Sequence, residues 1–135
     1  TNHVAHNNLG IAWMGQHQPG KAVPHLKKAV EYCPRCIESW LNLGESYKAM
    51  RQWQSSIDAF LAALQVNDDN VIAHEVLGTL YHVRGDGWLA IHHSRKAEAT
   101  YSKLFGSGYL KAVGLRRNLE GYYKQYFLRP EDFDA

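Results

Sequence analysis

The sequence predicts an all-α fold in which antiparallel helix hairpins stack into a superhelical solenoid. Three observations support this: a pattern that recurs every 34 residues, apolar side chains three and four residues apart within each copy, and short polar breaks between apolar stretches. The spacing predicts amphipathic helices, and a fixed period of this length is typical of repeat arrays. We expect three repeats within residues 1–105, at about 3–36, 37–70 and 71–105.

The first helix of each repeat carries three aligned columns. The segments "HNNLGIAW" (6–13), "WLNLGESY" (40–47) and "HEVLGTLY" (74–81) align without gaps. Because a Gly costs a helix roughly 1 kcal/mol relative to Ala, we expect the glycines where two helices approach closely. The columns hold a Leu, a Gly and an aromatic residue: Leu9, Leu43 and Leu77; Gly10, Gly44 and Gly78; Trp13, Tyr47 and Tyr81.

The second helix of each repeat has two columns of small residues, Ala22, Ser56 and Ala90, then Ala29, Ala63 and Ala97. Between them lie Leu26 and Phe60, but the third copy has Ser94. That copy can be read in phase, or shifted by seven residues onto Ala97 and Tyr101, and in both readings its second helix is extended. Short breaks such as "RQW" (51–53) predict hairpin turns, and "CPRC" (33–36) and "NDDN" (67–70) predict repeat boundaries.

These columns resemble the tetratricopeptide repeat family, whose unit has an aromatic residue, Leu-Gly and Tyr in its first helix, then small, aromatic and small residues in its second. The resemblance covers about residues 3 to 105, and the second copy matches best, with Trp40, Leu43, Gly44, Tyr47, Phe60 and Ala63. It implies that first helices line a concave groove in which partner peptides or helices bind.

The register of the resemblance assigns residues to this groove: Asn7, Ile11, Met14, Glu38, Leu41, Glu45, Lys48, Glu75, Thr79 and His82. Apolar residues beside carboxylates would suit a partner segment with apolar anchors and basic side chains. The alternative is an ordinary surface, or a groove filled by the chain's own C-terminal helix. A clamp for a partner's terminal carboxylate is not expected, because Ile11, Ile72 and Val76 replace the donors it needs.

Residues 106–135 are expected to form a capping helix and an acidic tail. After the flexible "GSG" (106–108), an amphipathic segment would cover the last apolar face of the array, and "LRPEDFDA" would trail off extended. Basic and aromatic residues make this helix a second candidate docking surface, for a subunit or a membrane surface, unless the aromatics pack on the third hairpin. Its residues are Arg116, Arg117, Tyr123, Lys124 and Phe127.

Cys33 and Cys36 lie in a turn with Pro34 and are either free thiols or a local disulfide. Ile37 stands where covalent haem attachment would need a His, and no second Cys pair completes a zinc site. Eight His are many for 135 residues, but His6 and His74 occupy the aromatic column of Trp40. We therefore expect His6 and His74 to be packing residues, and we predict no metal site and no cofactor.

Composition and motifs limit the function classes. The chain is 45% hydrophobic and 21% charged, and its net charge of +2 is spread evenly, so nucleic acid is not an expected partner. No apolar run reaches the roughly 20 residues of a membrane span. No nucleophile triad or phosphate loop is visible, so we expect no catalytic residues and no enzyme.

The sequence therefore predicts a non-catalytic scaffold that binds a protein partner, either alone or as a part or subunit of a larger assembly. Two alternatives stay open: a redox- or metal-linked accessory protein using "CPRC" and the histidines, and a regulatory fragment of a larger enzyme. The chain begins with Thr1 inside a helical pattern, so we expect a processed chain or a piece of a longer one. The family favours the cytoplasm, whereas a disulfide would favour a periplasmic or extracellular site.

Overall fold

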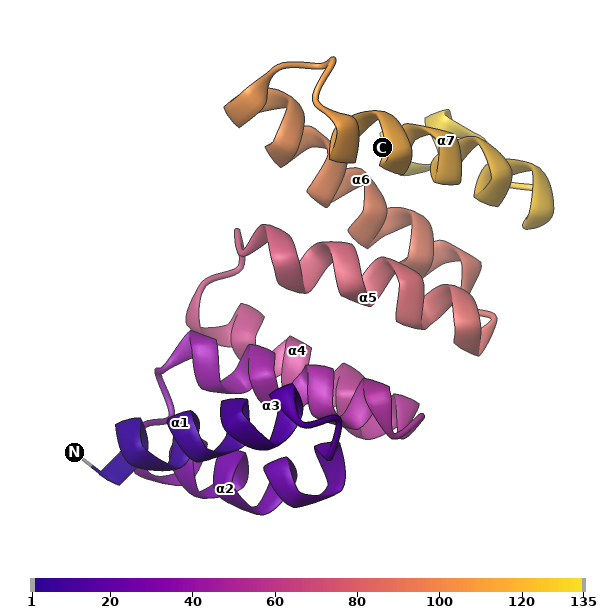
Figure 1. Cartoon of the computed structure of the whole chain (residues 1–135). Helices are drawn as coiled ribbons and strands as arrows, with labels where there is room; N and C mark the ends of the chain where they lie inside the picture. The colour runs from indigo at the N-terminus through magenta and orange to yellow at the C-terminus, as the bar shows by residue number, and fades with distance from the viewer. Residues whose placement is uncertain (1, 135) are drawn as a thin grey trace. The chain divides into compact units, whose positions relative to one another are not determined.

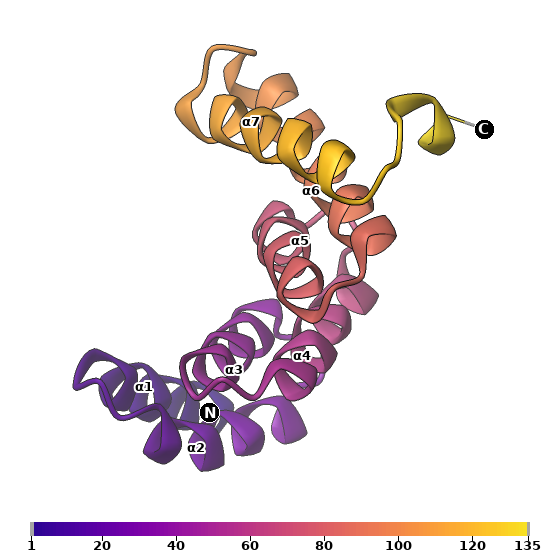
Figure 2. The ribbon, with the colours of Figure 1, turned by 90° about the vertical axis from the view of Figure 1, so that its right-hand side faces the viewer.

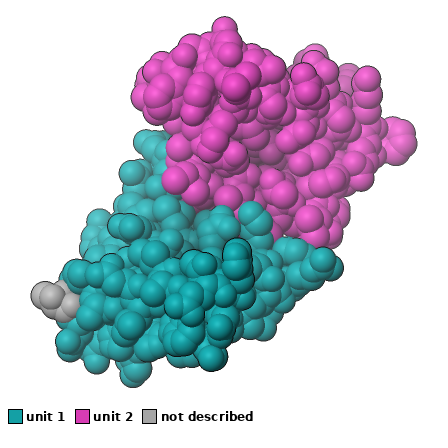
Figure 3. Space-filling model, in the orientation of Figure 1, with its two compact units in different colours: residues 1–70 teal, residues 71–135 magenta. Residues whose placement is uncertain are grey.

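The computed structural model describes residues 2–134. Within this range the regular secondary structure consists of helices joined by short turns, and there is no strand (Figure 1). The helices are α1 (Asn2–Gly15), α2 (Pro19–Tyr32), α3 (Ile37–Ala49), α4 (Trp53–Val66), α5 (Val71–Arg84), α6 (Gly87–Phe105), α7 (Leu110–Gln125) and the 3-10 helix η1 (Pro130–Phe133). They divide into two compact units, residues 1–70 and residues 71–135, coloured separately in Figure 3.

Unit 1 consists of two antiparallel hairpins, α1 with α2 and α3 with α4 (Figure 2). Leu26, Val30 and Leu43 form its buried centre with Ala22 and Ala59, and half-buried Trp13, Trp40 and Tyr47 pack around them. Leu9 stands in the column of Leu43, but it is 46% exposed. The difference arises because α2 precedes α3 and covers Leu43, whereas no described helix precedes α1 to cover Leu9.

Gly44 lies where α3 and α4 approach each other closely. A β-carbon there would lie 2.6 Å from the Phe60 ring, and the Ser56 hydroxyl donates a 2.7 Å hydrogen bond to the Gly44 carbonyl. The helix therefore accepts a residue of poor helix propensity because the neighbouring helix needs the space.

The turn that ends the first helix is the same in all three repeats. His17, Arg51 and Gly85 have φ angles of 59°, 57° and 82°, which is the left-handed region. The following amides donate back across the turn, from Gln18 to Trp13, Gln52 to Tyr47 and Asp86 to Tyr81, each at 2.9 Å. This pairing is the Schellman ending, which closes a helix and reverses the chain at once.

Unit 2 consists of the hairpin of α5 and α6, with α7 packed against α6. Ala97 and Tyr101 of α6 are buried against Ala112 and Leu115 of α7. A β-carbon on Gly78 would collide with the Ser94 hydroxyl, so Ser94 takes the place that Phe60 has in the preceding repeat. The third copy is therefore in phase, and α6 extends to 19 residues where α2 and α4 have 14.

The C-terminal segment differs from the extended tail that the sequence predicted. It folds back as η1, so that the Phe133 ring stacks on Trp88 with centroids 4.0 Å apart. Arg95 fixes it further, donating to Asp134 at 2.7 Å and to the Pro130 carbonyl at 3.3 Å. The composition of this segment showed that it is acidic and contains a Pro. Composition alone, however, does not predict contacts with residues that are distant in the sequence.

Candidate functional site

Asn7 and Met14 of the predicted groove lie at the boundary between α1 and α3. The Asn7 side-chain oxygen accepts hydrogen bonds from the Ser39 hydroxyl and the Asn42 amide, both at 3.1 Å, and the Met14 sulfur accepts one from Ser46 at 2.9 Å. Both side chains are half-buried. They therefore connect the two first helices of unit 1 rather than standing free on their surface.

The remaining groove residues of unit 1 are accessible. Ile11 is 43% exposed, Glu38 is exposed, and Leu41 is half-buried. The Glu45 carboxylate lies 3.7 Å from the Lys48 ammonium, one helical turn away. Such an exposed ion pair contributes less than about 1 kcal/mol, so either group can exchange its partner at little cost. We call Ile11, Glu38, Leu41, Glu45 and Lys48 the first-helix face.

In unit 2, two of the three predicted groove residues already have partners within the chain. Glu75 accepts a 2.7 Å hydrogen bond from the Tyr101 hydroxyl and lies 3.8 Å from the Lys111 ammonium. His82 lies 2.8 Å from the Tyr126 hydroxyl and stacks on Tyr122. Burial and then the Glu75 contact raise the pKa of Tyr101. Thr79 is exposed.

The second predicted docking surface lies on α7 and just after its end, and only some of its residues are accessible. Arg116 pairs with Glu98 at 2.6 Å, and the Tyr123 hydroxyl accepts a 2.8 Å hydrogen bond from Arg95. Arg117, Lys124 and Phe127 are exposed, Phe127 to 93%. The structure thus assigns Arg116 and Tyr123 to packing within unit 2 and leaves the other three accessible.

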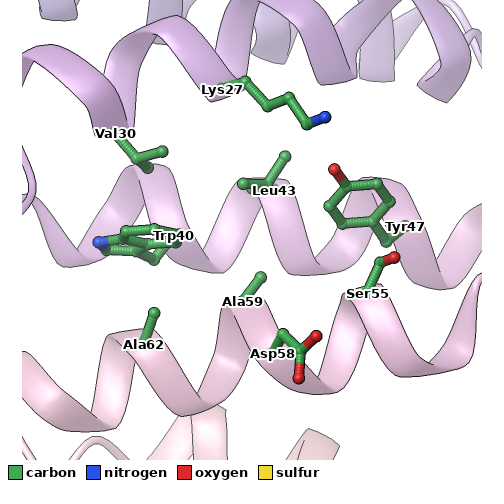
Figure 4. Close-up of a pocket in the computed structure, with 9 residues that line it drawn as sticks. All are labelled: Lys27, Val30, Trp40, Leu43, Tyr47, Ser55, Asp58, Ala59 and Ala62. Carbon is green, nitrogen blue, oxygen red and sulfur yellow. The ribbon is translucent and has the colours of Figure 1, made fainter.

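A hollow that the sequence did not indicate lies across α2, α3 and α4 (Figure 4). Its volume is about 440 Å³, and Trp40, Leu43 and Tyr47 of α3 contribute to its lining, with Lys27 and Asp58 carrying charges beside it. The columns identified Trp40 and Tyr47 as packing residues, but both are only half-buried.

Cys33 and Cys36 are joined in a disulfide at the turn between α2 and α3, with Cα atoms 5.5 Å apart. A His3 ring nitrogen and both sulfurs lie within 4.8 Å of one another. Sequence reasoning looked for further zinc ligands in a second Cys pair. It missed His3 as a neighbour of the cysteines because 30 residues separate it from Cys33.

Two histidine pairs occupy equivalent places in the first and third repeats. Nδ1 of His6 lies 3.5 Å from Nδ1 of His25, and Nδ1 of His74 lies 2.9 Å from Nδ1 of His93. The rings of each pair are stacked, which confirms that His6 and His74 pack in the aromatic column. Burial, and then the electrostatic effect of the neighbouring His74, lower the pKa of His93 to about 4.

Comparison with known proteins gives relatives that match part of the chain. A stretch of 98 residues is 31% identical to anaphase-promoting complex subunit CDC16 of Saccharomyces cerevisiae, covering 67% of this chain and 12% of that protein. Superkiller protein 3 of Schizosaccharomyces pombe is 26% identical over 98 residues, which cover 73% of this chain and 7% of that protein. The chain thus spans only about a tenth of these relatives, and no family model matches it.

Solved structures share the fold over nearly the whole chain. The nearly identical TPR-like repeats of a Podospora anserina kinesin-light-chain protein superpose with a TM-score of 0.74 at 17% identity, over 96% of this chain and 68% of that one. The chain belongs to the tetratricopeptide repeat family. Its 34-residue columns, their buried glycine contacts and the recurring Schellman turns are the features of this sequence that agree with that assignment.

Two further tetratricopeptide-like structures extend the comparison. The type III secretion translocator chaperone SycD of Yersinia enterocolitica has a TM-score of 0.82 at 12% identity, over 92% of this chain and 85% of that one. MamA has a TM-score of 0.73 at 25% identity, over 92% and 70%. Within residues 2–134 of this tetratricopeptide protein, every helix is too short or too polar to cross a lipid bilayer.

Proposed function

We propose that the chain is a non-catalytic protein-protein interaction scaffold that binds a segment of a partner protein along the first-helix face of unit 1. The observation that carries the proposal is the accessible combination of apolar Ile11 and Leu41 with the carboxylates of Glu38 and Glu45. Apolar side chains gain about 25 cal/mol for each Å² they bury, and charged hydrogen bonds add direction.

The partner that fits this face has apolar anchors with Lys or Arg side chains near them. A partner Arg can take Glu45 from Lys48, because the exposed pair is 3.7 Å apart and weakly stabilising. Asn7 and Met14 support the face from beneath, since their side chains bind Ser39, Asn42 and Ser46 of α3. The binding surface is therefore held in place before a partner arrives, which lowers the entropic cost of binding.

The α5 residues of the predicted groove are not part of this proposal. Glu75 and His82 would have to give up contacts with Tyr101, Lys111 and Tyr126 before they could bind a partner. The relatives support a role in assembly at a coarser level: one is named as a subunit of the anaphase-promoting complex, and one neighbour as a translocator chaperone.

A displayed library of random peptides, selected on the immobilised chain, tests the proposal. The selected peptides should be enriched in Lys or Arg beside apolar residues. Their affinity should fall at least about tenfold with Glu45→Lys and with Ile11→Asp, which corresponds to about 1.4 kcal/mol or more.

Asp58→Lys provides the matched control, because it makes the same charge reversal at an exposed residue of α4 beside the hollow. It should leave the affinity unchanged. Peptides that lose binding with Asp58→Lys but keep it with Glu45→Lys and Ile11→Asp would place the site at the hollow and refute the first-helix face.

A further inference from the structure

Three potential metal ligands come together at one end of unit 1. His3 is in the first turn of α1, whereas Cys33 and Cys36 flank the turn that joins α2 to α3. Their ligand atoms lie within 4.8 Å of one another, and all three residues are half-buried. Two separate segments of the chain therefore deliver one imidazole and two sulfurs to the same place.

The ligand set has the chemistry that zinc prefers. Zn²⁺ binds thiolate sulfur at about 2.3 Å and imidazole nitrogen at about 2.0–2.1 Å, and Cys-x-x-Cys is a common spacing for two of its ligands. Tetrahedral bonds of these lengths place the ligand atoms roughly 3.5 Å apart. The His3 nitrogen lies within 4.8 Å of both sulfurs, so a small adjustment of its side chain can bring it to this separation, while the two sulfurs have to move apart.

We propose that the reduced, dithiol form of the chain binds one Zn²⁺ ion through Cys33, Cys36 and His3. The site adjoins a cavity of about 240 Å³ that is lined by His3, Cys36 and Glu38 among others. Three protein ligands leave the fourth position open, and a water molecule from this cavity can fill it. This inference does not depend on the proposed partner binding.

The disulfide and the metal are alternative states of the same two sulfurs. A dithiol reductant breaks the Cys33–Cys36 bond by thiol–disulfide exchange and leaves with its own sulfurs joined, so that two electrons and two protons pass to the protein. Zn²⁺ then displaces the two thiol protons as it binds the thiolates. A disulfide oxidant reverses the exchange: it takes up two electrons from the thiolates and two protons from the solution and becomes a pair of thiols, the Cys33–Cys36 bond forms again, and the ion is released.

Binding has a structural consequence for unit 1. In the disulfide form, the covalent bond joins two residues within one short turn. In the zinc form, the ion would also attach His3, so the first turn of α1 would be tied to the start of α3. The N-terminal end of α1 would then be attached to the start of α3 in the zinc form but not in the disulfide form.

Metal titration of the full chain tests the inference. The chain is reduced with a dithiol, freed of the reductant under argon and titrated with Co²⁺, whose thiolate complexes absorb through sulfur-to-metal charge transfer. We expect this absorption to saturate at one Co²⁺ per chain and to disappear when Zn²⁺ is added. The disulfide form should give no such absorption.

Variants identify the ligands. Cys33→Ser and Cys36→Ser should each abolish the charge-transfer band, and His3→Ala should weaken Zn²⁺ binding by at least about tenfold. His6→Ala is the matched control, because His6 lies one turn along α1 and stacks on His25 instead. It should leave the affinity unchanged, and circular dichroism should confirm that each variant is folded.

Three results would overturn the inference. They are the absence of charge-transfer absorption in the reduced chain, His3→Ala binding that equals the unmodified chain, and a loss with His6→Ala that equals the loss with His3→Ala. The second result would mean that the two thiols alone bind the metal, and the third that the imidazole comes from a different place.

Discussion

The Nδ1 atom of His82 on α5 lies 2.8 Å from the hydroxyl of Tyr126, which directly follows α7. The same imidazole stacks on Tyr122, with ring centroids 4.5 Å apart. The repeat register placed His82 on the partner-binding groove, but the chain's own terminal segment contacts it. In unit 2, therefore, part of the predicted binding face serves to hold the terminal helix.

Removing the Tyr126 hydroxyl should loosen this attachment. Tyr126→Phe keeps the ring but deletes the hydrogen bond to His82, and we expect it to lower the free energy of unfolding by about 1 kcal/mol. Urea denaturation followed by circular dichroism measures the change. Lys124→Ala is the control, because Lys124 is exposed in the last turn of α7 and its removal should change the stability by less than about 0.5 kcal/mol. Equal effects would show that the hydrogen bond does not stabilise unit 2.

Gly44 and Gly121 should respond in opposite ways to the same substitution. Gly44→Ala drives a methyl group into the Phe60 ring, and overpacking of this kind costs about 1–3 kcal/mol. Gly121 lies in α7, where an added methyl group would meet nothing within 4 Å, so Gly121→Ala should stabilise the helix by about 0.5–1 kcal/mol. Thermal unfolding of both variants tests the pair, and a stabilised Gly44→Ala would mean that α3 and α4 can separate without loss.

Arg51 occupies a backbone conformation that suits Gly. It ends α3 in the left-handed region at φ 57°, where the third repeat has Gly85. Arg51→Gly should therefore raise the free energy of unfolding by a few tenths to about 1 kcal/mol, and Gly85→Ala should lower it by about 1 kcal/mol. Chemical denaturation of the two variants should show these opposite signs. A loss of stability in Arg51→Gly would contradict the prediction and indicate that the arginine side chain contributes more than its backbone strain costs.

Protonation of His93 should destabilise the folded chain in mild acid. Its folded pKa of about 4 lies below the unfolded value near 6.5, so the unfolded state binds the proton more readily between these limits. The neutral ring therefore contributes its full stability above about pH 6.5, and that contribution is lost as the pH falls toward 4. For one group of this kind, the loss reaches at most roughly 3 kcal/mol.

The pH effect can be separated from other titrations by a difference measurement. Unfolding free energies of the unmodified chain and of His93→Gln, measured between pH 4.5 and 7.5 at intervals, should converge as the pH falls, by an amount on the order of 1 kcal/mol per unit. Gln65→Ala, an exposed substitution that removes no titratable group, should run parallel to the unmodified chain over the same range. A constant difference between the unmodified chain and His93→Gln would mean that His93 does not titrate with folding.

The packing columns were predictable because they repeat. Trp40 faces Ala59 in the second repeat, whereas the same two columns hold His6 with His25 and His74 with His93 in the others. One large side chain beside a small one, as in Trp40 with Ala59, occupies about the same volume between paired helices as two side chains of intermediate size, as in each His pair. The sequence showed the first column and its aromatic character, but the second column became recognisable only when the rings were seen stacked.

The sequence by itself determined the helices, their pairing into hairpins, the places where Gly must stand and the family. These follow from spacing within 34 residues, because neighbouring helices in a repeat array contact mainly their nearest neighbours. Only the tertiary structure decided which polar side chains remain available. Tyr126 reaches His82 across 44 residues, and His3 meets Cys33 across 30, distances over which no local period relates one side chain to another.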